Sequence, residues 1–460
     1  MKMGAAKSTS DSASRSLTKY NQSITLFSPE ELAELKLIFH DICRDNANKN
    51  VFCEQHLKKY ISGRVPDTIV SKLFMMMCDK EEYVSYENFM VSMADFIKGM
   101  VDQQASVLYT LAISEDKIFT LSSFRKVLEM FLKCYEAILK NMDVNLTPSD
   151  TTKPNQVFVD VCVQNVQDGD IKSALDVCTW LQDKPLIQTI LTDIMMYCFH
   201  IKNNQLKEEQ SKADSTTTYL SPLLPQLVDV NWDNFTSLLS MPSILLINHH
   251  LPHNLRHIWR LVYAVDLHGA SFSTLVKKIS LQGPSILLVK DKEGHVFGGF
   301  ASVNWKIGPS FIGSSECFLF SLLPSMAIYE STSINEHYMY LNMDQETLPN
   351  GLGMGGQFSY FGLWLDQDFG IGHSKAQPRC TTYNSTQLSA SEQYNVDMLE
   401  VWAVGDIPKV TIKEEQTCSI LDKDPEARAL LDIIGKERKS EGLREDPTSD
   451  IPEIHNLPPM

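Results

Sequence analysis

The chain has 460 residues, 43% of them hydrophobic and 21% charged, which is enough apolar material for several buried cores. Its 57 Asp and Glu outnumber 41 Lys and Arg, and a net charge of -16 argues against a nucleic-acid surface, which needs clustered Lys and Arg. The 10 cysteines include no C-x-x-C pair, and no apolar run approaches the roughly 20 residues that cross a bilayer. The composition therefore favours a protein of a reducing, cytosolic compartment.

The first residues predict a flexible tail. Residues 1–25 are rich in Ser, Thr, Asn and Lys and have almost no apolar periodicity. From Met3 the chain reads MGAAKS, which fits the M-G-x-x-x-[ST] myristoylation pattern with Gly4 as the acceptor. Met1 and Lys2 precede this motif, so lipidation requires initiation at Met3.

Residues 26–145 repeat a pattern of helix, polar loop, short β-like step and helix. Ser28 and Pro29 supply an N-cap and a first helical residue. Three stretches, 44–55, 77–88 and 112–123, resemble the loops of EF-hands, yet neither end of any of them carries the carboxylate that calcium needs. The pattern therefore predicts a degenerate, EF-hand-like helical domain that binds no calcium.

Residues 146–235 have a less distinct pattern. Apolar residues recur at helical spacing from 155 to 200, whereas 202–218 are polar and charged. We expect helices and then a linker in this region, and no function follows from them.

From Ile244 onward, short apolar strands alternate with turns rich in Gly, Pro, Asn and Ser. The runs 286–289 and 295–303, separated by a tight turn, predict a hairpin. Residues 256–265 and 273–279 are expected to be helical. Further strands are expected at 317–323, 338–341, 360–365 and 399–404. The expected fold class is therefore α+β, with a helical first half and a β-sandwich with flanking helices at 242–406.

Several ordered blocks in 242–406 resemble the TLDc family. These blocks are WRLVY at 259–263, HGASF at 268–272, GP at 283–284, VFGGF at 296–300, CFLF at 317–320, PNGLGMGG at 349–356, FGLWLD at 361–366 and EVWAVG at 400–405. The resemblance covers a little over a third of the chain. It implies a β-sandwich with helices, oxidation-resistance phenotypes and binding to the vacuolar-type proton ATPase, and it brings no established catalytic chemistry.

The glycine-rich block 351–356 formally satisfies G-x-G-x-x-G. A dinucleotide site needs a strand before this motif and a helix after it, but Leu348-Pro349-Asn350 precedes and a β-like run follows. We therefore interpret these glycines as architecture and expect no cofactor. Gly351, Gly353 and Asp366, which lie in the TLDc blocks, are candidate partner-binding residues.

Two constellations could carry chemistry, although core packing explains each of them more simply. Five histidines, 249, 250, 253, 257 and 268, lie within twenty residues, and His253 and His257 would share a helix face, but no Cys joins them to complete a zinc site. His373 and Cys380 could form a base and a nucleophile, with Asp366 or Asp368 as the orienting group. We expect neither a metal site nor a catalytic residue.

The segment 420–445 predicts an amphipathic helix beyond the last TLDc block. Asp424 caps its start, and an apolar stripe includes Leu430, Leu431 and Ile434. Such a helix either packs on its own protein or lies in a partner's groove. We name these three residues as candidate partner contacts.

The leading interpretation, which the TLDc resemblance implies, is a non-enzymatic, cytosolic adaptor on lysosomal membranes that binds the vacuolar-type proton ATPase and links to mTOR nutrient signalling. One alternative is an oxidative-stress defence factor that uses Cys317 or Cys380 as a redox-active thiol. A second alternative is a calcium-responsive scaffold, which the missing loop carboxylates disfavour.

Overall fold

The computed structural model describes residues 17–407 except 47, 79–81, 114–117, 142–151, 202–220, 222, 359 and 377. Gly4 and the predicted helix at 420–445, with Leu430, Leu431 and Ile434, lie outside the described residues. No helix in the described ranges is long and apolar enough to span a bilayer.

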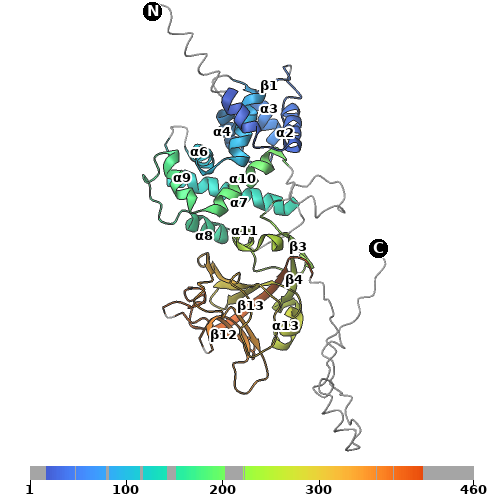
Figure 1. The fold of residues 1–460 in the computed structure, drawn as a ribbon, viewed down its shortest axis with the longest axis vertical. Helices are drawn as coiled ribbons and strands as arrows, with labels where there is room; N and C mark the ends of the chain where they lie inside the picture. The colour runs from blue at the N-terminus through green and yellow to red at the C-terminus, as the bar shows by residue number, and fades with distance from the viewer. Residues whose placement is uncertain are drawn as a thin grey trace, which may run out of the picture. The chain divides into compact units, whose positions relative to one another are not determined.

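The fold is α+β, as predicted: helices form the first half, and a largely antiparallel sheet region forms the second (Figure 1). The helices of the first half are α2 (Pro29–Ile42), α3 (Glu54–Ile61), α4 (Asp67–Met77), α5 (Tyr86–Met93), the π-helical turn η1 (Ala94–Lys98), α6 (Val101–Ala112), α7 (Leu121–Asn141), α8 (Thr152–Cys162), α9 (Ala174–Gln182) and α10 (Pro185–Phe199). The predicted flexible tail 1–25 is wrong for residues 17–24, which are helical because Tyr20 and Ile24 pack against the core.

Two helix–strand–helix units open the helical half. Helix α2 begins with a capping box, in which the Ser28 hydroxyl accepts from Glu31 N at 3.2 Å and the Glu31 carboxylate accepts from Ser28 N at 2.8 Å. Strand β1 (Val51–Phe52) pairs with β2 (Val84–Ser85), placing Phe52 opposite Val84. The described residues of the stretch 112–123 pair with neither strand; Ile113 and Phe119 form an isolated antiparallel bridge with each other.

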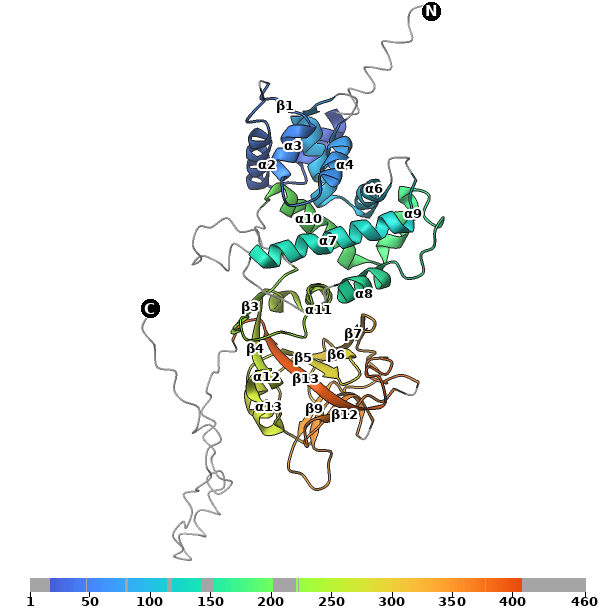
Figure 2. The ribbon, with the colours of Figure 1, turned by 180° about the vertical axis from the view of Figure 1, so that it is seen from behind.

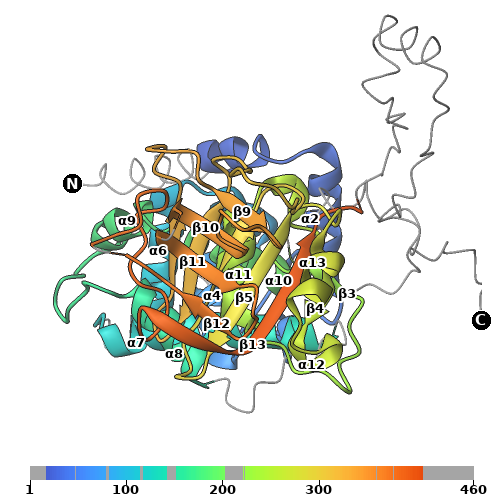
Figure 3. The same ribbon diagram turned by 90° about the horizontal axis from the view of Figure 1, so that it is seen from below.

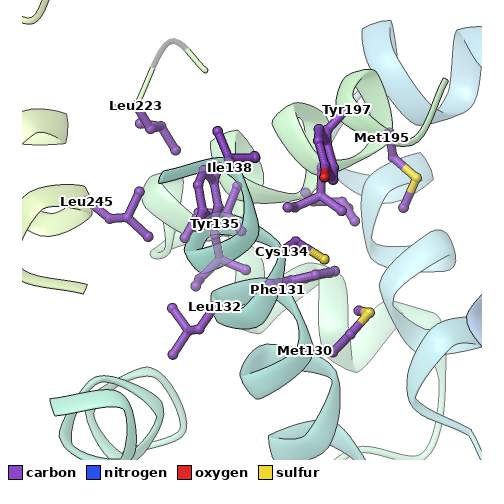
Figure 4. Packing of buried hydrophobic residues seen from close by; sticks show 14 of the residues in the cluster. Met130, Phe131, Leu132, Cys134, Tyr135, Ile138, Met195, Tyr197, Leu223 and Leu245 are labelled. Carbon is purple, nitrogen blue, oxygen red and sulfur yellow. The ribbon is translucent and has the colours of Figure 1, made fainter. Parts of the chain in front are cut away.

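The remaining helices of the first half surround α7. Tyr135 of α7 donates its hydroxyl to Asp193 of α10 at 2.6 Å, and Ser221 donates to the same carboxylate at 2.5 Å. Helix α11 (Met241–His250) packs against α7 and α8, and Figure 4 shows Leu245 of α11 beside Tyr135. One apolar core therefore continues from the helices into the second half.

The second half is a two-layered sandwich. Its strands are β3 (Gln226–Val228), β4 (Ile258–Ala264), β5 (Ser285–Asp291), β6 (Val296–Ala301), β7 (Phe318–Leu323), β8 (Ala327–Glu330), β9 (Met339–Asn342), β10 (Gly351–Gln357), β11 (Tyr360–Asp366), β12 (Ile371–His373) and β13 (Gln393–Val404). The first layer contains β3–β8 (Figure 2), the second contains β9–β12, and β13 belongs to both. Inward side chains such as Leu287 and Leu363 share one core between the layers.

Strand β13 joins the two layers. Its first residues pair with β12, and its later residues pair with β4 on the same side, while β5 runs along its other side (Figure 3). The outer face of the first layer belongs to the core that α11 and the helices share, through side chains such as Trp259 and Phe320. The outer face of the second layer has a separate small cluster of aromatic rings.

One helix prediction is wrong and the other is confirmed. Residues 256–265 were expected to be helical, but 258–264 form β4, which lies between β3 and β13. Helix α13 (Phe272–Ile279) forms as expected, with a Ser271 N-cap, after the short helix α12 (Val265–His268). The predicted hairpin is β5–β6.

Candidate docking surface

Strand β10 is the glycine-rich block, and its glycines let aromatic rings lie close to the strand. A Cβ atom at Gly351 would lie 2.5 Å from Trp364 Cζ2, and one at Gly353 would lie 2.6 Å from Phe361 Cδ1. Both glycines are buried. In this structure they shape the surface beneath the rings, and their role in partner binding stays a prediction.

The rings above these glycines form a tight stack. Phe361 and Trp364 lie with centroids 4.4 Å apart, and Tyr340 lies 5.7 Å from Phe361. In a regular strand, residues three apart point to opposite faces. The alternation breaks here beside Gly355 and Gly356, whose φ angles of +73° and +83° favour glycine.

A second set of side chains covers the edge of this stack. Phe311 stacks on His337 at 4.2 Å and on Phe358 at 5.2 Å. His373, directly opposite Trp364 in the sheet, stacks on its ring at 5.8 Å. Phe358 and Ile371 remain 39% and 54% exposed. We name the group Phe311, His337, Tyr340, Phe358, Phe361, Trp364, Ile371 and His373 the aromatic face.

Asp366 ends β11 beside the aromatic face. By strand alternation its side chain lies on the same face as Trp364. Its Oδ1 accepts from Asp368 N at 3.0 Å, and Gln367 N donates to Asn350 O at 3.2 Å, so loops 343–350 and 366–370 lie side by side. Asp344, Glu346 and Asp368 of these loops are exposed and Asp366 is half-buried. We name these four carboxylates the acidic tip.

The structure separates the suggested nucleophile and base. Cys380 is 1% exposed, and its Sγ would lie 2.9 Å from a Cβ at Gly362, in the core between the layers. His373 lies on the outer face, where burial lowers its pKa to about 4. Cys380 and His373 therefore face opposite sides of the sheet, and the proposed pair does not form. The Asp366 carboxylate accepts from the backbone N–H of Asp368 within its own turn.

The five clustered histidines do not share one helix face. His253 begins the 3-10 turn η3 (His253–Leu255), and His257 precedes β4, so the expected shared helix face does not exist. His257 contacts Asp406 at 3.1 Å, and His268 Nδ1 accepts from Ala264 N at 3.1 Å. Burial lowers the pKa of His249 to about 4.

Asparagine side chains organise the loop 44–55. At its third position, Asn46 Oδ1 accepts from Asn48 N at 3.3 Å, and at its fifth, Asn48 Oδ1 accepts from Asn50 N at 3.2 Å. Asn46 Nδ2 donates to Val51 O at 2.7 Å. The side-chain oxygens at two ligand positions of an EF-hand therefore accept from backbone groups of the loop here.

Glu400 is a buried polar site that the sequence reasoning missed. Its carboxylate, 1% exposed, accepts from Ser237 Oγ at 2.7 Å, Leu238 N at 2.5 Å and Trp402 Nε1 at 3.0 Å. Burial raises its pKa to about 7, against the opposing effect of these donors. An acidic residue inside the apolar run 398–404 was the available signal.

Comparison with known proteins identifies this architecture. The TLDc domain family matches residues 232–405. The MTOR-associated protein MEAK7 of Xenopus laevis is 36% identical over 447 residues, covering 91% of this chain and 95% of that protein. The protein of the same name from Homo sapiens is 37% identical over 455 residues, with 92% and 97% coverage. The chain therefore belongs to the family of the MTOR-associated TLDc proteins.

A second, lower similarity covers less of the chain. Oxidation resistance protein 1 of Rattus norvegicus is 32% identical over 188 residues, which cover 39% of this chain and 21% of that protein. The first group of relatives thus matches more than nine-tenths of the chain, whereas this second match covers less than half of it.

Proposed function

We propose that this protein is a non-enzymatic adaptor linked to mTOR signalling, which binds the vacuolar-type proton ATPase on the cytosolic side of lysosomal membranes. The observation that carries the mTOR link is the similarity over more than nine-tenths of the chain to proteins named MTOR-associated. The ATPase and the lysosomal membrane enter from the TLDc resemblance. The MTOR-associated protein MEAK7 of Mus musculus adds support, with 50% identity over 230 residues, which cover 50% of this chain and 50% of that protein.

Support for a role without catalysis comes from the surroundings of the reactive side chains. Cys317 and Cys380 are each 1% exposed, and His373 lies across the sheet from Cys380. A nucleophile needs a base within hydrogen-bond reach. A sheet face of locked aromatic rings instead suits binding, because rigid rings lose little conformational freedom when a partner docks.

Two segments outside the described residues complete the proposed adaptor. The predicted helix at 420–445 would supply a second partner contact through Leu430, Leu431 and Ile434. Myristoylation at Gly4 would supply one membrane anchor, and because a single chain binds membranes only marginally, the partner contact would supply the other. The helical half, an EF-hand-like scaffold without calcium chemistry, would then act as a spacer between them.

Affinity purification tests this function directly. The tagged full chain is recovered from lysosomal membranes, and the bound proteins are identified by mass spectrometry. Recovery of ATPase subunits, together with a change in mTOR output when the chain is depleted, is the expected result. If every ATPase subunit is absent, the ATPase part of the proposal is wrong. If mTOR output is unchanged, the signalling part is wrong.

The similarity to Oxidation resistance protein 1 favours a second candidate, a redox-active defence factor. That function requires a thiol that peroxide can reach, and Cys317 and Cys380 are the candidates. Cys317 Sγ donates to Ser302 Oγ at 3.2 Å inside the fold. We expect both thiols of the native protein to react with hydrogen peroxide more slowly than free cysteine. Rapid, selective oxidation of either one, measured by mass spectrometry, would favour this alternative.

A further inference from the structure

The exposed part of the aromatic face is apolar and uncharged. Ile371, 54% exposed, and Phe358, 39% exposed, stand at its two sides. Between them His373 is held neutral, because burial lowers its pKa to about 4. A surface of this kind gains free energy when a partner covers it, in proportion to the apolar area removed from water.

The rings beneath the exposed residues are already ordered. Phe361 and Trp364 stack at 4.4 Å over Gly351 and Gly353, and Tyr340 donates its hydroxyl to Pro349 O at 2.9 Å. The face therefore has one shape before any partner arrives. A preorganised surface binds more tightly because the ordering cost has already been met in folding.

The charges around the face are mainly negative. The segments that form it, 306–316, 331–350 and 357–376, contain six carboxylates and two lysines. The carboxylates are Glu316, Glu336, Asp344, Glu346, Asp366 and Asp368, and the lysines are Lys306 and Lys375. Lys375 already faces Glu392, with Nζ and Oε1 3.7 Å apart. Loops 343–350 and 366–370, which carry the acidic tip, contain no Lys or Arg.

We propose that the aromatic face and the acidic tip together bind a basic, apolar segment of a partner polypeptide. This proposal rests on the adaptor function proposed above and names the chemistry of its ligand. Apolar side chains of the segment pack beside Ile371 and Phe358, and its Arg or Lys side chains pair with Asp366 and Asp368. Arginine fits best, because its planar fork matches a carboxylate and stacks on aromatic rings.

The same charges disfavour other occupants. Phosphate-rich nucleic acid and anionic lipid headgroups would meet the carboxylates of the acidic tip and be repelled. Charge complementarity across an interface steers association and rejects wrong partners. The proposed occupant is therefore a positively charged stretch of protein.

The test is a selection of random 16-residue peptides on the immobilised full chain. We expect the enriched peptides to combine Arg or Lys with aromatic or aliphatic residues. Ile371→Asp should weaken the best peptide at least about tenfold, and raising the salt from low to high concentration should weaken it further because exposed charges are screened. Asp344→Asn/Glu346→Gln/Asp368→Asn should reduce affinity and the salt dependence together.

Matched controls separate docking from damage to the fold. Leu281 is also 54% exposed and has a φ of 62° that Asp tolerates, so Leu281→Asp should leave peptide affinity unchanged. Asp233→Asn is the charge control, because Asp233 is exposed and lies in a different segment. If Ile371→Asp lowers the melting temperature, Phe358→Ala replaces it as the test of the face.

Several results would overturn the proposal. These are enrichment of acidic or uncharged peptides, no enrichment at all, or binders that ignore both the face and the tip variants. Vesicles of phosphatidylcholine and phosphatidylserine that bind wild type but not Ile371→Asp would show a membrane surface instead. None of these results depends on the ATPase, so a failure here is distinguishable from a failure of the proposed function.

Discussion

Glu400 accepts a hydrogen bond from the indole of Trp402, two residues further along β13, with Oε2 and Nε1 3.0 Å apart. Ser237 Oγ and Leu238 N donate to the same carboxylate, and Trp232 stacks on the Trp402 ring at 6.5 Å. One buried acid thus binds the segment directly before α11 to the sandwich.

The first prediction concerns pH. Burial raises the pKa of Glu400 to about 7 from 4.5, so between these values the folded state binds more protons than the unfolded state. The contribution of Glu400 to the free energy of unfolding therefore falls as pH rises from about 4.5 to about 7, by roughly 3 kcal/mol, and is constant above that. Glu400→Gln should remove this slope. Denaturant unfolding at pH 5 to 8, followed by tryptophan fluorescence, measures it.

The comparison must be the difference between wild type and variant. Burial lowers the pKa values of His200, His249 and His373 to about 4. Their contribution to the free energy of unfolding therefore falls as pH drops below about 6.5, which opposes the Glu400 effect. These histidines are present in both proteins and cancel. Glu293→Gln, at an exposed position, serves as the control. A parallel pH profile for wild type and Glu400→Gln would contradict the prediction.

The second prediction concerns Gly353. An alanine there would press its Cβ against Phe361, at 2.6 Å in the present arrangement, and displace the ring stack. We expect Gly353→Ala to lower the free energy of unfolding by about 1–3 kcal/mol. Gly308→Ala has no atom within 4 Å of the new methyl group and should be close to neutral. Equal melting temperatures for the two variants would mean that the ring stack is looser than described.

The third prediction is that calcium does not bind tightly to the helical half. The anchor carboxylates are missing from all three loops, and Asn46 and Asn48 already bind backbone groups. Isothermal titration of the full chain should show no calcium binding at micromolar concentrations, with magnesium as the control. Calcium binding with micromolar affinity would contradict this prediction and favour the calcium-responsive scaffold.

The fourth prediction concerns Gly4. If Met3 is the effective start, Gly4→Ala removes the acylation site and should lower the fraction of protein on lysosomal membranes. Ala5→Gly keeps the motif and is the control. Membrane fractionation supplies the measurement. An intact Met1-Lys2 N-terminus, found by mass spectrometry, would refute the prediction.

The fifth prediction concerns what residues 420–460 contribute to stability and to partner binding. Deleting residues 420–460 should leave the melting temperature nearly unchanged and weaken partner binding. If Leu430, Leu431 and Ile434 instead complete a core, each buried side chain contributes about 1.5–3 kcal/mol, and the truncated protein should melt far earlier. Thermal melting and pull-down on the same truncation distinguish these results.

The sequence predicted the order of elements better than their pairing. The run 256–265 has apolar residues at spacings that suit a helix or a strand, and periodicity alone does not separate the two. Strand β4 forms because β13, far away in the chain, hydrogen-bonds along it. The pairing of β4 with β13 cannot be inferred from the local pattern of one sequence.

The candidate site was predictable to a similar extent. The glycines of β10 could be interpreted as architecture from the residues around them, and the β-strand context confirms that. The identity of the rings that pack over these glycines was not predictable. Phe361 and Trp364 lie on one face only because the strand alternation breaks beside Gly355 and Gly356. Two of the three donors to Glu400, Ser237 and Leu238, lie 163 and 162 residues before it, beyond any local pattern.

Because β13 belongs to both layers, unfolding of one layer is coupled to unfolding of the other. Residues 393–395 of β13 pair with β12, and the residues that follow them pair with β5 and β4, so both layers depend on the position of one strand. We therefore expect a disturbance of one layer to reach the other along β13, and amide hydrogens of β5 and β11 to exchange with deuterium at similar rates under native conditions. A force or a ligand acting on the aromatic face would be felt, through β13, at Glu400 on the other layer.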